Sequence, residues 1–316
     1  MFKKILLLTF AMAFTLVPSM AFENKDIVKN NPVPYLKLNN GTKMPQLGLG
    51  TFMLDDNGEA YNAVLTALKL GYRHIDTAHM YGNEKSIGKA IKDSKIPREE
   101  IWVTSKLWPT EYENADVALD KMLNRLDLEY IDLVYLHQPV GNFNKGWEFL
   151  IEAQKQGKVK AIGISNFDKV ESIFDTFMKT AKVKPQTMQL ECHPYAQRVM
   201  WQKKLKKHGI QQENWYPLGG RQSNGLILKD PVINEIAKAH NKSAAQIIIR
   251  WHIQKGFAVI PGASNPDYIK ENIEVFDFEL SKDEMKKIEK LNTEKRIFNP
   301  PFEEQKVQYM QAVFPD

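Results

Sequence analysis

The sequence predicts an α/β protein built as a closed (β/α)8 TIM barrel with an N-terminal hairpin cap and two extra helices. Three observations support this prediction. A chain of 316 residues with 43% apolar content is long enough to bury a large core. From residue 46 onward, short apolar runs alternate with amphipathic stretches of helical length, which is typical of a parallel sheet. Eight such runs with their crossovers fit a closed barrel of roughly 250 residues.

The first residues are expected to lie outside the fold. Lys3 and Lys4 precede an apolar run at 5–17, and Ser19-Met20-Ala21 forms a small-x-small pattern. This arrangement predicts a signal peptide over 1–21 and a linker over 22–34. The run is too short for a span of roughly 20 residues. We therefore expect general secretory (Sec) export to the periplasm or the medium, with no stable membrane span after cleavage. An uncleaved anchor is one alternative, and a cytoplasmic protein with a misread leader is the other.

Residues 35–316 are expected to form a single barrel domain, beginning with a hairpin. The segments 35–38 and 43–44 flank Asn40-Gly41, and this dipeptide supplies the positive backbone angles of a tight turn. The hairpin is expected to cap one end of the barrel.

The elements of the barrel follow in order along the chain. The expected strands are 47–51, 72–76, 101–105, 131–136, 161–165, 187–191, 211–215 and 257–260. Helical candidates between them include 59–70, 115–126, 145–156, 169–181 and 244–254. The two extra helices are expected over 230–240 and from a capping box at 281–284. The tail at 296–316 has little periodicity and is expected to fold over the barrel mouth. An open doubly wound sheet is the alternative, but no Gly-x-Gly-x-x-Gly follows the first strand.

Composition excludes several classes of function. The formal charge of +5 is spread along the chain, so we expect no nucleic-acid partner. Cys192 is the only cysteine, which excludes an internal disulfide and a cysteine-based metal cluster, and it is expected to be buried. His79, His137 and His193 lack the companion carboxylates and spacing of a ligand set, so no metal site is expected.

Four polar residues stand at the carboxyl ends of consecutive expected strands. Asp76 and Tyr81 follow the second strand, Lys106 the third and His137 the fourth. Parallel strands bring these ends together, so we expect one shared pocket. A tyrosine has an unperturbed pKa of about 10, and an adjacent ammonium lowers it. Lys106 is expected to play that part and to be held by Asp76, while His137 orients a carbonyl oxygen.

Each residue alone also has a structural explanation. Asp76 can cap a loop, Tyr81 can pack at a strand end, Lys106 can be solvated and His137 can be a satisfied core histidine. Their joint placement favours the shared pocket, as do Ser165, Asn166 and Gln189 at the next two strand ends.

These residues lie in motifs that resemble the aldo-keto reductase family. The motifs are GYRHIDTA at 71–78, YGNE at 81–84, TSKLW at 104–108, LH at 136–137, GISNF at 163–167 and Asn272. The resemblance covers about 36–291 and is nearest to bacterial reductases of diketo sugar acids and 2-oxo aldehydes. It implies a barrel enzyme that reduces aldehydes or ketones with NADPH or NADH, in which Tyr81 donates the proton, Lys106 and Asp76 tune it, and His137 positions the substrate carbonyl.

The resemblance also implies a cofactor site. Ser165, Asn166 and Gln189 have the donors and acceptors that an amide group needs, and in the family they bind the nicotinamide carboxamide. Trp215 offers a flat face for stacking, with core packing as the alternative. A mobile loop at 219–224 is expected over the pyrophosphate. The full expected cofactor set is Gly50, Thr51, Phe52, Asp76, Ser165, Asn166, Gln189, Trp215, Tyr216, Pro217, Leu218, Gly219, Pro261, Gly262, Ala263, Ser264, Asn265, Tyr268, Glu271 and Asn272. The expected substrate residues are Phe52, Trp108 and His137.

One departure from the family pattern concerns the choice of cofactor. Gly262 and Tyr268 stand where relatives usually have lysine and arginine, two cations that hold the extra phosphate of NADPH. Asn265-Pro266 still marks a helix start whose backbone N–H groups and Ser264 can bind an anion. We therefore expect relaxed selectivity, with NADH also accepted; Tyr268 can instead stack on adenine.

Two further expectations complete the interpretation. A monomer is expected by analogy with the family. Export conflicts with the cytoplasmic supply of nicotinamide cofactors, so a barrel that binds a nicotinamide nucleotide without turnover, as a sensor or accessory subunit, is the alternative function.

Overall fold

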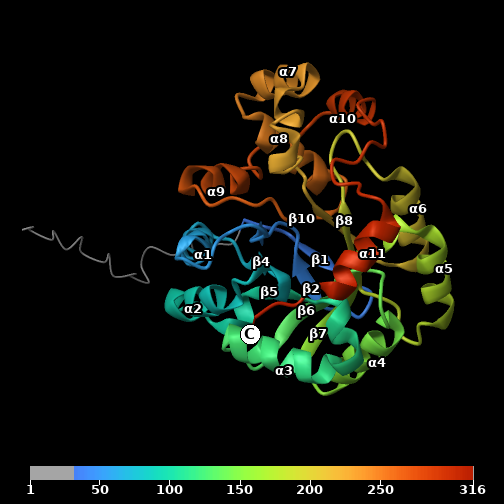
Figure 1. Cartoon of the computed structure of the whole chain (residues 1–316). Coiled ribbons are helices and arrows are strands. Elements are labelled where there is room, and N and C mark those ends of the chain that lie inside the picture. The colour runs from blue at the N-terminus through green and yellow to red at the C-terminus, as the bar shows by residue number, and fades with distance from the viewer. Residues whose placement is uncertain (1–31, 316) are drawn as a thin grey trace, which may run out of the picture.

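A closed ring of parallel strands forms the centre of the molecule. The computed structural model describes residues 32–315, so the expected signal peptide and most of the expected linker lie outside the described residues. Eight strands form one parallel sheet in the order β10-β9-β8-β7-β6-β5-β4-β3 (Figure 1). Parallel bridges from Leu47 to Val259 and from Gly50 to Gly262 join the first strand to the last. The predicted (β/α)8 barrel is therefore confirmed, and the open doubly wound sheet is wrong.

The strands are β3 Leu49–Gly50, β4 His74–Asp76, β5 Trp102–Leu107, β6 Ile131–Leu136, β7 Val159–Ser165, β8 Thr187–Glu191, β9 Gln211–Trp215 and β10 Ala258–Val259. Two of the predicted boundaries were wrong in an informative way. Lys106 lies inside β5 rather than after it, because it pairs with Tyr135 of β6. Tyr72 and Arg73 precede β4, since the Tyr72 backbone N–H still bonds Ala67 O of the preceding helix.

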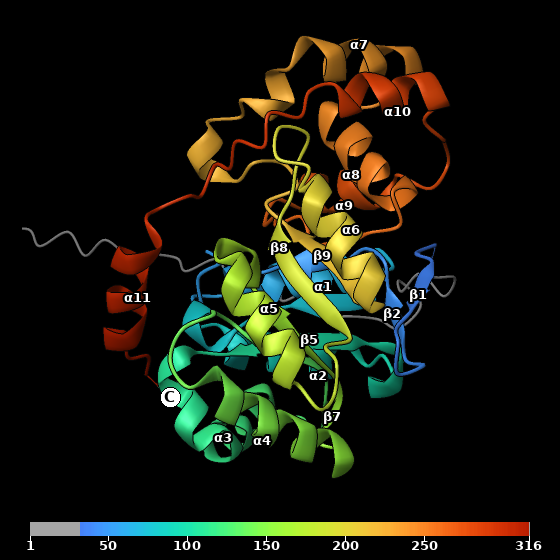
Figure 2. The ribbon, with the colours of Figure 1, turned by 90° about the vertical axis from the view of Figure 1, so that its right-hand side faces the viewer.

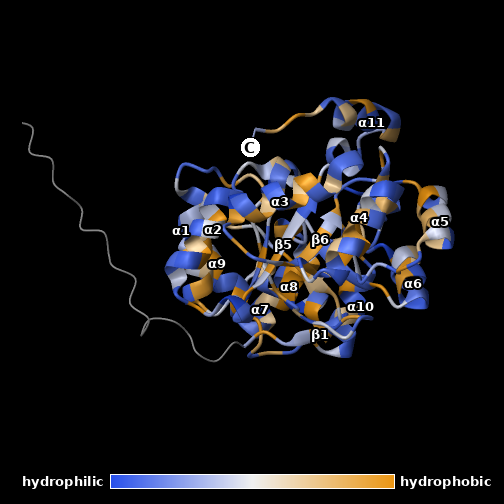
Figure 3. Cartoon of the chain, turned by 90° about the horizontal axis from the view of Figure 1, so that it is seen from below, coloured by the Kyte–Doolittle hydropathy of each residue, from blue (hydrophilic) through white to orange (hydrophobic). Residues whose placement is uncertain are grey.

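The helices around the ring are α1 Glu59–Lys69, α2 Glu84–Ser94, α3 Ala115–Leu126, α4 Phe143–Lys155, α5 Glu171–Thr180, α6 Val199–His208, α7 Pro231–His240, α8 Ala244–Gln254, α9 Pro266–Ile273, α10 Lys282–Glu289 and α11 Phe302–Gln311. The two extra helices predicted at 230–240 and from 281 are α7 and α10. The Ser281 hydroxyl and the Glu284 carboxylate form the predicted capping box of α10. In Figure 3 the helices around the ring carry both hydrophilic and hydrophobic residues along their length.

Helix α2 was not among the named candidates, and one glycine explains how it packs. A Cβ atom on Gly88 would lie 2.1 Å from Leu126 O, so only glycine lets α2 approach the end of α3 this closely. Ile87 and Ile91 of α2 are buried beside this contact. The close approach brings α2 against the barrel, where Glu84 meets Arg125 and Ser105.

The predicted hairpin is present as β1 Tyr35–Lys37 and β2 Lys43–Pro45. Its connection is longer than a two-residue turn: Leu38 N–H bonds Thr42 O at 2.9 Å, and of Asn40 and Gly41 only Gly41 has a positive φ, of 89°. Leu38 and Met44 are buried against Trp102 and Tyr135, so the hairpin plugs the end of the barrel interior.

The tail closes the opposite end. In Figure 2, α11 and the β1–β2 hairpin lie on opposite sides of the ring of strands. Trp108 Nε1 donates to Tyr309 O at 2.8 Å, and a Cβ atom added at Gly141 would lie 3.1 Å from Met310 Sδ. The tail was predicted to cover the mouth, but its helix was not predicted. Within residues 32–315, no helix combines the length and apolar character required to cross a bilayer.

Candidate active site

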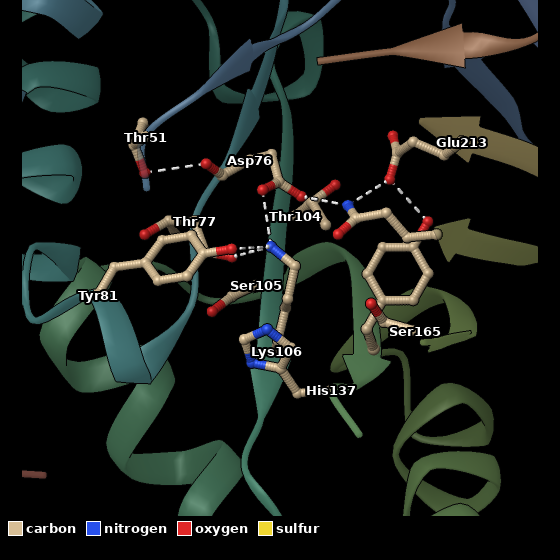
Figure 4. Close-up of polar contacts among 12 residues, drawn as sticks. Thr51, Asp76, Thr77, Tyr81, Thr104, Ser105, Lys106, His137, Ser165 and Glu213 are labelled. Carbon is tan, nitrogen blue, oxygen red and sulfur yellow. Dashed lines mark hydrogen bonds and ion pairs between the residues drawn. The ribbon is translucent and has the colours of Figure 1, made fainter. Parts of the chain in front are cut away.

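Three charged or polar side chains meet at the mouth of the barrel (Figure 4). The Lys106 ammonium donates to Asp76 Oδ1 at 2.6 Å, to Thr77 O at 2.7 Å and to Tyr81 Oη at 3.2 Å. Lys106 is fully buried and Asp76 is 1% exposed. Asp76 ends β4, Lys106 lies in β5, and Tyr81 ends a short 3-10 helix, His79–Tyr81. The sequence prediction placed these residues in one pocket, and their side chains do meet.

Burial and two neighbouring charges determine the pKa of the Tyr81 phenol. Burial raises the pKa of Tyr81 to about 12, while the Lys106 ammonium lowers it and the Asp76 carboxylate raises it. Lys106 therefore acts in the predicted direction, but the net shift is upward and not toward an acidic phenol. Burial also raises the pKa of Asp76, and the nearby Lys106 charge opposes that shift. At neutral pH Tyr81 keeps its proton, as a proton donor must.

His137 follows β6 and faces the same pocket. Its ring lies edge-on to those of Tyr81 and Trp108, with centroid distances of 6.0 and 5.0 Å. Burial, with a smaller effect of Lys106, holds the pKa of His137 well below its usual range, so the ring is neutral and has one N–H to donate. Its buried Nδ1 has no hydrogen-bond partner within the described residues. Phe52 packs 5.0 Å from the Tyr81 ring and completes an aromatic wall.

Of the three amide-binding candidates, Ser165 and Asn166 lie at the end of β7, whereas Gln189 lies in the middle of β8 rather than at its predicted end. Asn166 Nδ2 donates to His137 O and to Ser165 Oγ, both at 3.0 Å. Gln189 Nε2 donates to Asp76 Oδ2 at 2.7 Å. Ser165 pairs with Gln189 in the sheet. Gln189 Oε1 therefore remains as the hydrogen-bond acceptor of the Gln189 side chain. Together, Ser165, Asn166 and Gln189 provide the donors and acceptors that a carboxamide needs.

Trp215 ends β9 beside this cluster. Its ring contacts Tyr216 edge-on at 4.8 Å, and its buried Nε1 has no hydrogen-bond partner in the part of the chain that the structure describes. The next residues turn sharply, with φ of 51° at Tyr216 and 87° at Gly219. A Cβ on Gly220 would lie 2.9 Å from the Tyr216 ring. Glycine is required there for the loop after β9, which includes Pro217 and Leu218, to fold over the tyrosine.

The remaining cofactor candidates form a strip along the seam between β3 and β10. Gly50 N–H bonds Pro261 O at 3.1 Å, and the Thr51 hydroxyl donates to Asp76 O at 2.9 Å. Gly262 is exposed next to Gly50. The strip then continues through Ala263 and Ser264 to Asn265.

Helix α9 begins at the end of this strip. Asn265 Oδ1 accepts from the Asp267 N–H and caps the helix. Tyr268 is 61% exposed and Asn272 is buried, while Glu271 accepts a hydrogen bond from the Ser243 hydroxyl. In the first turn of α9, Pro266 has no N–H and the Ile269 N–H donates to Asn265 O, which leaves the Tyr268 N–H for an anion. Residues 262 and 268 supply no cationic side chain.

Two groups of site residues were missed from the sequence. Glu213 of β9 accepts from Gln189 Nε2 and from Tyr135 Oη, each at 2.7 Å. A charged residue inside a strand with buried neighbours was the available signal. At the rim, Lys169 Nζ donates to Gln305 Oε1 at 2.6 Å and lies near Tyr309 of the tail.

The donor set fits a nicotinamide nucleotide. Amide donors and acceptors, an aromatic face and a helix N-terminus lie in order from the Tyr81 pocket to α9, and the buried His137 Nδ1 and Trp215 Nε1 lack partners among the described residues. Within residues 32–315, no group of three or more His, Cys, Asp or Glu side chains is placed to hold a metal ion.

The fold and this site define a (β/α)8 oxidoreductase of the nicotinamide-dependent class. Residues 46–293 match the model of the aldo/keto reductase family. A 9,11-endoperoxide prostaglandin H2 reductase of Trypanosoma cruzi is 44% identical, covering 84% of this chain and 93% of the relative. A glyoxal reductase of Bacillus subtilis is 41% identical, covering 85% and 96%. The structure of a Bombyx mori aldo-keto reductase in complex with NADP superposes with a TM-score of 0.78 at 29% identity, covering 84% and 95%.

The chain belongs to the aldo/keto reductase family. It is an NAD(P)H-dependent oxidoreductase that reduces aldehydes or ketones to alcohols. The named relatives are reductases, which favours catalysis over the non-catalytic alternative.

Proposed function

We propose that Tyr81 is the proton donor of this reductase. The observation that carries the proposal is the contact of the Lys106 ammonium with both Tyr81 Oη at 3.2 Å and Asp76 Oδ1 at 2.6 Å. The ion pair holds one ammonium N–H on the phenol oxygen, so the phenolate that forms when the proton leaves is stabilised where it appears. Asp76 is a positioning residue, because it acts through Lys106.

These contacts suggest a separate role for each residue in the reduction of the carbonyl group. When bound beside Ser165, Asn166 and Gln189, a reduced nicotinamide would supply a hydride to the carbonyl carbon. Tyr81 hydrogen-bonds the carbonyl oxygen and passes its proton to it as negative charge develops. The neutral His137 ring donates a second hydrogen bond to the same oxygen, and Phe52 and Trp108 exclude water from the reacting atoms.

Cofactor binding is assigned to the strip of residues between the pocket and α9. Ser165, Asn166 and Gln189 hold the carboxamide and Trp215 stacks on the ring. Backbone groups of 216–219 and 261–265 hold the phosphates, together with Gly50 and Thr51. Because Gly262 and Tyr268 carry no charge, NADPH is held less selectively than in relatives with two cations there, and NADH also serves.

Small 2-oxo aldehydes are the proposed substrates. The glyoxal reductase of B. subtilis is 41% identical over 96% of its own length. The mouth is narrowed by the Trp108 ring, which packs on Tyr309 and Phe314 of the tail at 5.0 and 5.3 Å. We infer that this aromatic wall favours short carbonyl compounds.

An absorbance assay tests the proposal. Oxidation of NADPH and of NADH is followed with glyoxal, methylglyoxal and longer aldehydes, using the parent protein and Tyr81→Phe. We expect turnover by the parent with both cofactors, and loss of most activity in Tyr81→Phe. Unchanged turnover in the variant removes Tyr81 from the mechanism, and a strong preference of the parent for NADPH removes the relaxed selectivity.

We also infer that residues 1–21 direct export and that 35–316 fold as one barrel. By analogy with the family, the mature enzyme is inferred to be a monomer. The supporting observations are the basic and apolar leader pattern and the family match confined to 46–293. N-terminal sequencing of protein from the periplasm is expected to start at Phe22. A chain that begins at Met1 in the cytoplasm contradicts export.

A further inference from the structure

A second carboxyl group lies behind the Tyr81 pocket, inside the barrel. Glu213 is fully buried. It is linked to Asp76 by one side chain, because Gln189 Nε2 donates to Asp76 Oδ2 and to Glu213 Oε2, each at 2.7 Å. Figure 4 shows these contacts continuing the line from Tyr81 through Lys106 and Asp76 to Glu213.

These two bonds fix the orientation of the Gln189 amide. An amide nitrogen has two hydrogens, and here each is directed to a different carboxyl group. The flipped amide would place its carbonyl oxygen against both carboxyl groups, so only one orientation is compatible with the pair. Gln189 Oε1 is therefore the group that remains to accept from the carboxamide NH2 of a nicotinamide.

The charges of the cluster do not balance if both carboxyl groups are ionised. The titratable side chains that face Glu213 in the described residues are His74 and Asp76 of β4, Lys106 of β5 and Tyr135 of β6. Lys106 is the one cation among them, and its ammonium contacts Asp76. Burial lowers the pKa of His74 to about 4, so that ring is neutral. Burial raises the pKa of Glu213 and favours its protonated form.

The His74 ring gives an independent geometric indication of where a proton lies. His74 Nδ1 is 3.2 Å from Pro45 O, an acceptor, so Nδ1 carries the ring hydrogen. His74 Nε2 then has a lone pair that accepts from the Thr104 hydroxyl at 3.1 Å, and it lies 3.6 Å from Glu213 Oε1. That oxygen is buried and has no hydrogen-bond partner within residues 32–315. No donor therefore reaches Oε1 from His74, and a proton on the carboxyl group avoids a buried negative charge on an oxygen without a partner.

We propose that Glu213 is a positioning residue that carries a proton at neutral pH and, in that neutral form, locks Gln189 and Asp76 in place for the cofactor. The inference rests on the proposed role of Tyr81. With Glu213 neutral, the buried cluster contains one ammonium and one carboxylate, so the full effect of Lys106 remains directed at the phenol. With Glu213 ionised, a second buried negative charge opposes the phenolate that forms on Tyr81.

Two substitutions separate this role from simple packing. Glu213→Gln copies the shape of a protonated carboxyl group and keeps an oxygen for Gln189 and Tyr135. Glu213→Met has similar size but no acceptor. We expect the cofactor Kd, measured by fluorescence quenching, to rise far less in Glu213→Gln than in Glu213→Met. Glu213→Met is expected to raise the cofactor Kd by about ten-fold through the lost hydrogen bonds, with little change in the KM for the carbonyl substrate.

Isotope-edited infrared spectroscopy of the cofactor-free protein reports the proton directly. We expect a carboxylic-acid C=O band at neutral pH that shifts on ¹³C-glutamate labelling and is absent in Glu213→Gln, which also tests the proposal if Glu213→Met does not fold. Absence of that band in the parent overturns the proposal, as does a Glu213→Gln variant as impaired as Glu213→Met, or a folded Glu213→Met variant with the parent's cofactor Kd. If the parent binds cofactor and shows the band but reduces no carbonyl compound, the proposed function fails instead.

Discussion

Replacing Lys106 with methionine removes the ammonium that contacts Tyr81 while keeping a long side chain in the same buried position. In the parent this ammonium donates to Asp76 at 2.6 Å, to Thr77 O at 2.7 Å and to Tyr81 at 3.2 Å. Removing one partner of a buried ion pair costs about 3–5 kcal/mol in the free energy of unfolding. Without Lys106 the pKa of Asp76 rises further, so the folded variant binds a proton that the unfolded chain releases above about pH 4. The stability deficit relative to the parent is therefore smaller at acidic pH and larger at alkaline pH.

The same substitution is expected to lower kcat by about 10²–10⁴, the usual contribution of a positioned proton transfer. Urea denaturation at several pH values measures the stability, and steady-state reduction of methylglyoxal measures kcat. The control is the double variant Lys106→Met with Asp76→Asn, in which neither charge remains. We expect the double variant to regain stability but not activity. Recovery of turnover in the double variant would show that the phenol does not need the ammonium, and would contradict the role of Lys106.

Three further predictions concern other parts of the chain. Burial lowers the pKa of His252 to about 3, so below about pH 6.5 only the unfolded chain binds a proton at this residue. As the pH is lowered from about 6 to about 4, the unfolding free energy of the parent should fall about 1.4 kcal/mol per pH unit more steeply than that of His252→Gln, and equal slopes contradict this. Gly262→Lys with Tyr268→Arg is expected to raise the ratio of kcat/KM for NADPH over NADH by about ten-fold or more through new charge-assisted contacts, and an unchanged ratio argues against a phosphate site at the start of α9. Removing residues 301–316 deletes the Tyr309 carbonyl that accepts from Trp108 Nε1; the KM for aldehydes should rise while the cofactor Kd stays constant, and a parallel change in both contradicts a role of the tail confined to the substrate.

The side chains that meet at the mouth of the barrel could be predicted from the sequence, because the order of the strands alone brings their carboxyl ends together. Polar side chains at the ends of successive parallel strands converge whatever the intervening helices do, so Asp76, Tyr81, Lys106 and His137 were placed in one pocket correctly. The exact end of each strand was harder to predict from the sequence. Lys106 was placed after its strand, but its pairing with Tyr135 extends β5 by two residues.

The interior network and the tail needed the structure. In the sequence Glu213 is one of several polar residues in β9, and its role depends on Gln189 and Asp76, which are distant along the chain. The one residue that helix α11 buries is Gln305, so this helix has no apolar stripe from which it could be predicted. Its position depends on contacts such as Lys169 with Gln305. The net upward shift of the Tyr81 pKa depends on burial, which spacing alone does not reveal.

The proposed role of the Tyr81 hydroxyl is to deliver the proton that completes carbonyl reduction. Single-turnover oxidation of bound NADPH by methylglyoxal, measured together with the cofactor Kd in the same preparation of Tyr81→Phe, tests it most directly. For Tyr81→Phe we expect a rate constant lower than that of the parent by a factor of about 10²–10⁴, with the cofactor Kd unchanged. A Tyr81→Phe rate constant equal to that of the parent contradicts it.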